Sequence, residues 1–325
     1  MHLAILIPVF NDWTALSLLV GELDKINLPS GIDVSLFVVD DGSSDPPVLD
    51  YPVHTLRQLR NIEVLTLACN LGHQRAIAVG LVEIRHRKRF DAILVMDSDG
   101  EDRPSDIPRL VDELARHPGH IICAQRRYRP GLLTFRMWYE LYKFGFRVLT
   151  GVRINFGNFC LIPAARLESL VSNSSIWNNL PGTLIRSRLP LVSLPSDRGR
   201  RYAGKSKMNF VSLVMHALGA MAVYNDIVMV RLMLTAFAVS ALTALGILGV
   251  VYMKLFTALA TPGWATSAAG ILFIFMVQAL MLFTIAAFNM MSARSIKAVI
   301  PLLDAPSFVL SRRVIFSNEL TEAAE

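Results

Sequence analysis

Two aspartates, Asp97 and Asp99, are the side chains whose type and spacing could most directly do chemistry in this chain. They follow the uncharged apolar run Ile93 to Met96, which is typical of a buried strand, so they lie at its carboxyl end. Side chains alternate along a strand, so positions i and i+2 can face the same side. Carboxylates this close repel unless they share a proton or a cation. A hard dication, Mg²⁺ or Mn²⁺, often bound with a phosphate, is the natural partner. The alternative is a solvated acidic corner.

Alternating strands and helices must position these carboxylates. Apolar runs predict strands at Leu3 to Ile7, Asp33 to Val39, Glu63 to Leu67, Ile93 to Met96 and Ile121 to Gln125. Periodic segments predict helices at Trp13 to Ile26, Asn70 to Arg87 and Pro104 to Arg116. This alternation predicts an α/β fold with a doubly wound, mostly parallel sheet. Ligands bind at the carboxyl rim of such sheets. We expect that rim to gather Asp40, Asp41, Arg75, Asp97 and Asp99.

Two apolar runs lie in the last third of the chain. Hydrophobic residues make up 53% of the sequence and the mean hydropathy is +0.45, values too high for a purely soluble protein. The run Ile227 to Met253 contains one charge, Arg231, and the run Ala268 to Met291 contains none. At about 1.5 Å per residue, each run can cross a hydrocarbon layer of about 30 Å. We expect two transmembrane helices, and the alternative is a pair of buried core helices.

Charge predicts the orientation of these spans. The connector Lys254 to Ser267 holds one lysine, whereas basic residues precede the first span and follow the second. By the positive-inside tendency, we expect a cytoplasmic (inner) membrane location, with the catalytic domain and both termini in the cytoplasm and no signal peptide ahead of the first strand. Three scattered cysteines suit a reducing compartment. The net charge of +6 favours anionic membranes and substrates over nucleic acid.

Four motifs together resemble a known family. They are Ile7 to Asn11, Val39 to Asp45, Asn70 to Gly72 and Met96 to Asp99. As a set they resemble the successive signatures of family 2 glycosyltransferases with the GT-A fold, a Rossmann-like sheet, over about Leu3 to Lys207. The two carboxyl-terminal spans resemble the polyprenyl-phosphate branch of that family, which includes dolichol-phosphate mannose synthases.

The resemblance implies roles at a nucleotide-sugar donor. It places Asp40 and Asp41 against the nucleoside and Pro8 of the first motif at the same site. It implies that Asp97 and Asp99 hold Mg²⁺ or Mn²⁺ at the sugar diphosphate, with Asp99 as the direct ligand.

The resemblance also implies further contacts with the donor from the helix that begins after Gly72, through His73 or Arg75. His73 stands where lysine is common in the family. It either contacts the donor or is an exposed residue at the start of the helix.

Asn158, within Phe156 to Cys160, departs from the family, where an aspartate usually stands as a candidate base. Asparagine cannot take a proton at neutral pH. A sugar hydroxyl acceptor would lose general-base help typically worth about 10²- to 10⁴-fold. A phosphate monoester has a second pKa of about 6, so it is already mostly dianionic at neutral pH and needs no base. Asn158 therefore favours a lipid-phosphate acceptor, and the alternative is a weakened enzyme.

The segment Gly199 to Ser206 matches the P-loop pattern letter for letter. A P-loop also needs a later strand ending in a Mg²⁺-binding aspartate, and the chain instead enters its apolar runs. The resemblance gives the same residues another role, with the cations Arg201 and Lys207 offsetting charge as the nucleotide leaves and Ser206 contacting the donor. Alternatively, the basic residues anchor the chain to anionic lipid.

Two further segments predict membrane contact. Leu132 to Leu149 interleaves aromatic and basic residues, which suits an interfacial helix, a path for a lipid acceptor, or a core helix with a basic face. Residues 209–226 have the periodicity of an amphipathic interfacial helix. After the second span, residues 292–325 are expected to form a cytoplasmic tail with a disordered acidic end.

We therefore expect a catalytic domain over residues 1–208 of a membrane-anchored inverting glycosyltransferase. Its donor is expected to be a UDP- or GDP-linked sugar and its acceptor polyprenyl phosphate at the cytoplasmic face. The alternatives are the same fold with another lipid or glycan acceptor, and a non-catalytic, membrane-tethered binder of nucleotide sugars. The family resemblance alone suggests a homo-oligomer.

Overall fold

The computed structural model describes residues 1–45, 49–52, 56–126, 133–204, 210–257 and 263–318. The chain divides into two compact units. A sheet unit comprises Met1–Trp138, Arg153–Val223 and Val299–Glu325, and a helical unit comprises Tyr139–Val152 and Tyr224–Ala298.

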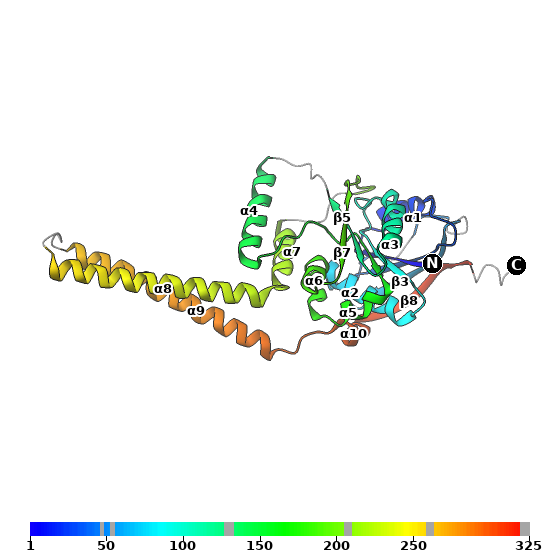
Figure 1. Cartoon of the computed structure of the whole chain (residues 1–325). Coiled ribbons are helices and arrows are strands. Elements are labelled where there is room, and N and C mark those ends of the chain that lie inside the picture. The colour runs from blue at the N-terminus through cyan, green and yellow to red at the C-terminus, as the bar shows by residue number, and fades with distance from the viewer. Residues whose placement is uncertain (46–48, 53–55, 127–132, 205–209, 258–262, 319–325) are drawn as a thin grey trace. The chain divides into compact units, whose positions relative to one another are not determined.

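An eight-stranded sheet forms the centre of the sheet unit (Figure 1). Its strands are β1 (His2–Val9), β2 (Asp33–Asp40), β3 (Leu59–Leu67), β4 (Ala92–Val95), β5 (Ile121–Arg126), β6 (Cys160–Pro163), β7 (Leu191–Ser196) and β8 (Val309–Ser317). The strand order is β7-β5-β6-β4-β1-β2-β3-β8. β6 runs antiparallel to β4 and β5, and β8 runs antiparallel to β3, whereas the other neighbours are parallel. The predicted mostly parallel α/β sheet is confirmed.

The parallel strands at the centre bring three polar loops to one rim. β1 pairs with β2 from His2 opposite Asp33 to Val9 opposite Asp40, and with β4 up to Leu6 opposite Val95. The loops that follow β1, β2 and β4 therefore leave the same edge of the sheet. This register gathers the acidic residues of separate sequence motifs.

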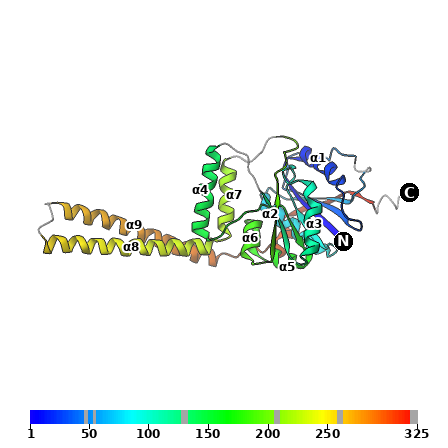
Figure 2. The ribbon, with the colours of Figure 1, turned by 45° about the horizontal axis from the view of Figure 1, so that its top comes forward.

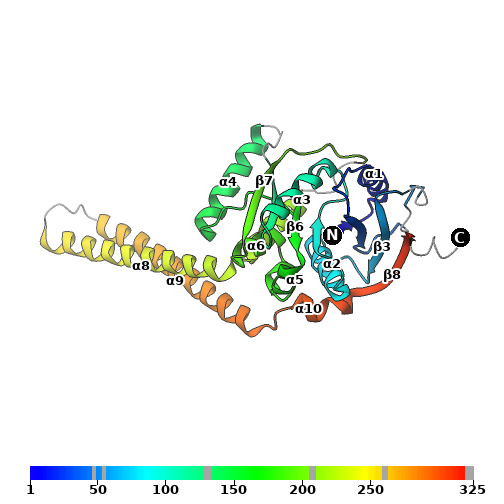
Figure 3. The same cartoon turned by 45° about the vertical axis from the view of Figure 1, so that its right-hand side comes forward.

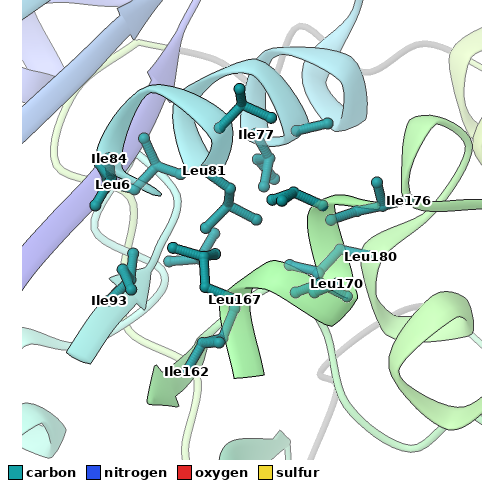
Figure 4. Close-up of a cluster of buried hydrophobic side chains, with 14 of the residues drawn as sticks. Leu6, Ile77, Leu81, Ile84, Ile93, Ile162, Leu167, Leu170, Ile176 and Leu180 are labelled. Carbon is teal, nitrogen blue, oxygen red and sulfur yellow. The ribbon is translucent and has the colours of Figure 1, made fainter. Parts of the chain in front are cut away.

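Apolar side chains cover both faces of the sheet because β1 and β4 carry apolar residues at successive positions and so present them to both sides. In β1, Ala4 and Leu6 belong to one cluster of buried side chains, and Leu3 and Ile5 belong to the other. Figure 4 shows part of the first cluster, in which Leu6 lies beside Leu81 and Ile84. This face carries α2 (His73–Arg87), α5 (Ala164–Val171) and α6 (Leu180–Arg186), and the other carries α1 (Trp13–Asp24) and α3 (Ile107–Arg116).

Several elements of the sheet unit were not predicted. They are β6, α5, α6, β8, α10 (Pro301–Asp304), and the 3₁₀ turns η3 (Ser174–Trp177) and η4 (Ala305–Phe308). The predicted helix Pro104 to Arg116 is present as a 3₁₀ turn, η2 (Pro104–Asp106), followed by α3. The segment 209–226, predicted as an amphipathic interfacial helix, contains the helix α7 (Phe210–Ala222), and its place at a membrane surface stays a prediction.

The segment after the apolar runs returns to the sheet and adds a strand. β8 pairs along β3, and Figure 3 shows the two strands side by side. Arg312 of β8 forms an ion pair with Glu83 of α2, with Nε 2.8 Å from Oε1. Glu83 also lies 3.4 Å from Arg87, whose guanidinium contacts the buried Glu63 of β3. A segment that the sequence indicated only as a tail is thus part of the sheet.

The helical unit contains two long apolar helices, α8 (Asn225–Phe256) and α9 (Trp264–Ser295), and the end of α4 (Leu133–Thr150). α8 and α9 lie side by side as a hairpin (Figure 2). Both are long and apolar enough to cross a membrane, and only 6% and 11% of their most apolar windows are buried. Such low burial argues against the alternative of two core helices.

One charge stands at the start of the first apolar run, and the fold gives it a partner. The Nη1 group of Arg231 donates to the carbonyl oxygen of Val148 at 2.5 Å, in the last turn of α4. Carbonyl groups in the last turn of a helix have no partner within the helix, and a cation there satisfies one of them. Arg231 therefore joins α4 to α8, beside an edge-to-face contact between Phe146 and Tyr224.

Candidate active site at the carboxyl rim of the sheet

The acidic pair after β2 organises the loops around it. Both carboxyl groups are buried. Asp40 accepts a hydrogen bond from the backbone N–H of Ser43 at 3.0 Å. Asp41 accepts from the backbone N–H groups of Leu71 and Gly72, at 2.7 and 2.9 Å. Through Asp41, the loop after β2 is tied to the loop that opens α2.

Burial raises the pKa of Asp41 above its ordinary value, and the bonds from Leu71 and Gly72 oppose that rise. The next residue, Gly42, has φ +70°, and a Cβ there would lie 2.7 Å from the backbone nitrogen of Asn70. The Asp-Asp-Gly motif therefore needs its glycine for a close backbone approach. Pro8 is a buried residue of β1. The contacts of Pro8, Asp40 and Asp41 with a nucleoside stay a prediction.

A second group joins α2, the loop after β4 and the loop before β6. The Nε2 atom of His73 lies 3.1 Å from Oδ1 of Asp97 and 2.9 Å from Nδ2 of Asn158. The Oδ1 atom of Asn158 accepts from Nε2 of Gln74 at 2.9 Å. The Oε1 atom of Gln74 in turn accepts from the backbone N–H of Leu180 at 2.7 Å. The structure therefore brings His73 and Asn158 next to Asp97, the one member of this group that was predicted for the rim.

His73 faces two partners with one nitrogen. Nε2 cannot both accept from Asn158 and donate to Asp97, because a ring nitrogen does one or the other. Burial by itself lowers the pKa of His73, but Asp97, with help from Asp102 and Asp41, outweighs it and raises the pKa. The charged imidazolium can donate to Asp97, whereas the neutral ring can accept from the NH₂ group of Asn158, and the raised pKa shifts the balance toward the charged form. Asp102 is buried and accepts from the backbone N–H of Asp97 at 3.0 Å, so it holds the loop in place.

A third group centres on Arg201. Its Nη1 atom lies 3.0 Å from Oδ2 of Asp99, and its Nη2 atom lies 2.5 Å from Oδ2 of Asp12. Its Nε–H group donates to the carbonyl oxygen of Ala203 at 2.9 Å. Burial raises the pKa of Asp99, the neighbouring Asp97 adds to that rise, and Arg201 opposes it. One guanidinium thus compensates the charge of two carboxylates from different loops.

Arg201 lies in a segment without helix or strand, Asp197 to Gly204, which we call the strap. Its backbone N–H groups at Gly199 and Tyr202 donate to the carbonyl oxygens of Glu101 and Asp99, at 2.8 and 2.9 Å. The Tyr202 ring covers Gly100, where a Cβ would lie 2.4 Å from the ring and φ is +85°.

Within its described residues, the strap follows the acidic loop and begins no helix, unlike a P-loop. The predicted site residues Ser206 and Lys207 lie outside the described part of the chain.

Asp97 and Asp99 fit a divalent cation by their chemistry. Each carboxylate already gives one oxygen to a protein cation, His73 or Arg201. Among the residues that the structure describes, no group of three or more His, Cys, Asp or Glu side chains is placed to hold a metal. Mg²⁺ is usually held by one or two carboxylates together with substrate phosphates. The pair therefore suits a metal whose coordination a nucleotide diphosphate completes.

Other predicted and unpredicted residues complete the picture. Arg75 lies over the ring of Trp177, 5.7 Å from its centre, so its donor contact stays a prediction. Sequence reasoning gave no role to Asp12, Gln74 or Asp102. Asp102 belongs to the acidic run after β4 and could have been noticed there, whereas no local signal pointed to Gln74.

Several known proteins are similar to this chain in sequence. An uncharacterised glycosyltransferase, YkoT of Bacillus subtilis, is 27% identical over 290 residues, which cover 84% of this chain and 82% of the relative. An undecaprenyl-phosphate 4-deoxy-4-formamido-L-arabinose transferase of Pseudomonas fluorescens is 24% identical over 261 residues, 78% of this chain and 73% of the relative.

Among solved structures, glucosyl-3-phosphoglycerate synthase of Mycobacterium tuberculosis, in complex with Mn²⁺, UDP-glucose and phosphoglyceric acid, aligns with a TM-score of 0.48 and 17% identity. The alignment covers 70% of this chain and 79% of that one. The family model described as "Glycosyl transferase family 2" matches residues 4–172, just over half of the chain. That span contains β1 to β6 and the acidic loops of the rim, and this chain belongs to glycosyl transferase family 2.

Proposed function

We propose that this glycosyltransferase moves a sugar from a UDP- or GDP-linked donor to polyprenyl phosphate at the cytoplasmic face of a membrane. The observation that carries the proposal is Asn158, an amide at the rim beside His73 and Asp97. An amide cannot deprotonate a hydroxyl, whereas a phosphate acceptor arrives already ionised. The relative named as an undecaprenyl-phosphate transferase supports the same class of acceptor.

The donor is proposed to bind across the rim. Asp40 and Asp41 would lie against its nucleoside, and Asp97 and Asp99 would hold Mg²⁺ or Mn²⁺ at its diphosphate. The metal, when bound, supplies charge stabilisation to the leaving diphosphate. Arg201 already lies 3.0 Å from Asp99 and is proposed to neutralise the same charge, together with Lys207.

The reaction is a single displacement. An oxygen of the acceptor phosphate attacks the anomeric carbon, the bond from that carbon to the diphosphate oxygen breaks, and the nucleoside diphosphate leaves with the electron pair. No proton has to be removed from a dianionic acceptor. One in-line step inverts the configuration at the anomeric carbon.

The hairpin of α8 and α9 is proposed to hold the enzyme in the membrane where its acceptor resides. The distribution of basic residues supports cytoplasmic flanks on both sides of the hairpin. α7 carries the exposed apolar side chains Val214, Met215 and Leu218, which suit an interfacial helix.

Transfer assays test the proposal directly. Purified protein in detergent would be incubated with Mn²⁺, polyprenyl phosphate and a panel of labelled UDP- and GDP-sugars, with Asp99→Ala as the inactive control. The expected product is an extractable labelled lipid that mild acid cleaves. An acid-stable glycolipid or a polymer would instead identify another acceptor, and donor binding without any transfer would identify a non-catalytic binder.

A further inference from the structure

We propose that Gln74 is a positioning residue that fixes the side chain of Asn158 with its N–H group toward the acceptor. Position 158 would then serve the reaction as a hydrogen-bond donor to an anionic oxygen. The inference rests on the proposed function, because it concerns how the same site recognises a phosphate acceptor.

The orientation of both amides follows from one backbone group. The N–H of Leu180, the first residue of α6, can only donate, so the Gln74 atom 2.7 Å from it must be the oxygen Oε1. The other terminal atom of Gln74 is then the NH₂ group, which donates to Oδ1 of Asn158 at 2.9 Å. The NH₂ group of Asn158 is therefore left on the side of His73, 2.9 Å from Nε2. The backbone N–H of Leu180 thus sets the assignment of nitrogen and oxygen in both amides, and the NH₂ group of Asn158 donates to Nε2 of His73 when that ring is neutral.

The hydrogen bonds that link Leu180, Gln74 and Asn158 are anchored in the buried core. Gln74 is 8% exposed and Leu180 is fully buried. The N-terminus of α6 is also fixed by Asn179, whose Oδ1 atom accepts from the backbone N–H of Gly182 at 2.8 Å. Turning Gln74 over would set two N–H groups against each other beside Leu180, a buried mismatch that costs free energy. The direction of the Asn158 amide is therefore imposed from outside the rim.

The NH₂ group points into the part of the rim where phosphates are expected. Its neighbour His73 contacts Asp97, one of the two proposed metal ligands. An N–H group at this place attracts an anionic oxygen, whereas a carboxylate repels it. With aspartate at position 158, the NH₂ group of Gln74 would hold one carboxylate oxygen, and the other would face the acceptor. Gln74 thus serves either residue, and the residue at 158 decides whether the site presents a donor or a base.

Two near-isosteric variants test the proposal. Gln74→Glu keeps an acceptor for Leu180 but has no N–H to give, so Asn158 should rotate and present its oxygen to the acceptor. Asn158→Asp presents a carboxylate there directly. Because hydrogen bonds to charged groups are the strong ones, each variant should raise KM for polyprenyl phosphate about tenfold or more, with KM for the nucleotide sugar changed by less than about twofold. Gln58→Glu is the matched control. It makes the same chemical change just before β3, at the end of that strand away from the rim, and should leave the kinetics unchanged.

Each of the following outcomes would refute either the inference or the proposed function. If Gln74→Glu lowers the unfolding temperature and shifts both KM values together, Gln74 is only structural and the inference is wrong. If Asn158→Asp raises kcat, the site lacked a base and the inference is wrong. Active wild-type protein whose acceptor KM does not respond to Gln74→Glu refutes the inference alone. Wild-type protein that uses a hydroxyl acceptor and leaves polyprenyl phosphate untouched refutes the proposed function itself.

Discussion

Removing the guanidinium of Arg201 should destabilise the protein and make it depend on a bound dication. Arg201→Gln leaves Asp12 and Asp99 facing each other without the cation that they share. The side chains of all three residues are only 17–18% exposed, so water compensates poorly for the loss. The variant keeps the length of the side chain and much of its hydrogen-bonding capacity, so it tests charge rather than packing.

The expected magnitude follows from burial. Exposed ion pairs are worth about 0–1 kcal/mol, and removing one partner of a buried pair costs about 3–5 kcal/mol. For groups that are mostly buried, we expect Arg201→Gln to lower the free energy of unfolding by about 2–4 kcal/mol. Asp12→Asn should cost only about 1 kcal/mol, because Arg201 keeps its bond to Asp99. The asymmetry between the two variants is the signature of one cation serving two carboxylates.

Thermal unfolding in detergent, with and without Mn²⁺ and UDP, measures both effects. Mn²⁺ added without UDP should raise the unfolding temperature of Arg201→Gln more than that of the wild type, because the metal replaces the charge that Asp12 and Asp99 have lost. Arg60→Gln is the matched control, since Arg60 pairs with Asp33 at 3.4 Å and both side chains of that pair are exposed. Equal unfolding temperatures for Arg201→Gln and wild type, or equal shifts on adding Mn²⁺ without UDP, would show that this reasoning is wrong.

Three further perturbations have defined outcomes. Asp99→Ala should abolish sugar transfer while the protein still inserts into membranes, and unimpaired turnover would end its assignment as a metal ligand. Gly100 has φ +85° and lies against the Tyr202 ring, so Gly100→Ala should displace the strap, weaken donor binding and lower the free energy of unfolding by about 1–2 kcal/mol. Unchanged donor affinity in calorimetry would contradict this expectation. The hydrogen bond from Arg312 lowers the pKa of Glu83, so the stability that this pair adds should be present above about pH 4.5 and fade as pH falls below it. Arg312→Gln should flatten that part of the unfolding curve against pH, and identical pH curves would count against the pairing of β8.

The sheet was predictable where its strands carry their signal locally. β1, β4 and the run Leu36 to Val39 of β2 are apolar at almost every position, which is the pattern of strands buried on both faces. β6 covers only four residues, and β8 contains adjacent arginines. β8 pairs with a strand more than 240 residues earlier in the chain, and no periodicity within a segment reports such a distant partner.

The same limit explains which site residues were missed. Aspartates that directly follow apolar strands, such as Asp97 and Asp99, could be assigned to the rim from the strand pattern alone. Asp12 meets Arg201 across 189 positions, and Gln74 meets Leu180 across 106. Their roles depend on which loops the fold places in contact. A glutamine or an aspartate beside a helix start is also an ordinary surface residue, so composition could not single them out.

The rim carries its own counter-ions. Asp97 faces His73 and Asp99 faces Arg201, so each proposed metal ligand is already paired with a protein cation. A dication entering this site competes with His73 and Arg201 for the charge of the two carboxylates, whereas a dication arriving with a diphosphate also gives these protein cations a new anionic partner. Metal and nucleotide are therefore expected to bind as a unit, because the exchange conserves charge pairing only when both are present. The strap that brings Arg201 to Asp99 is, on this argument, the element that couples nucleotide binding to metal binding.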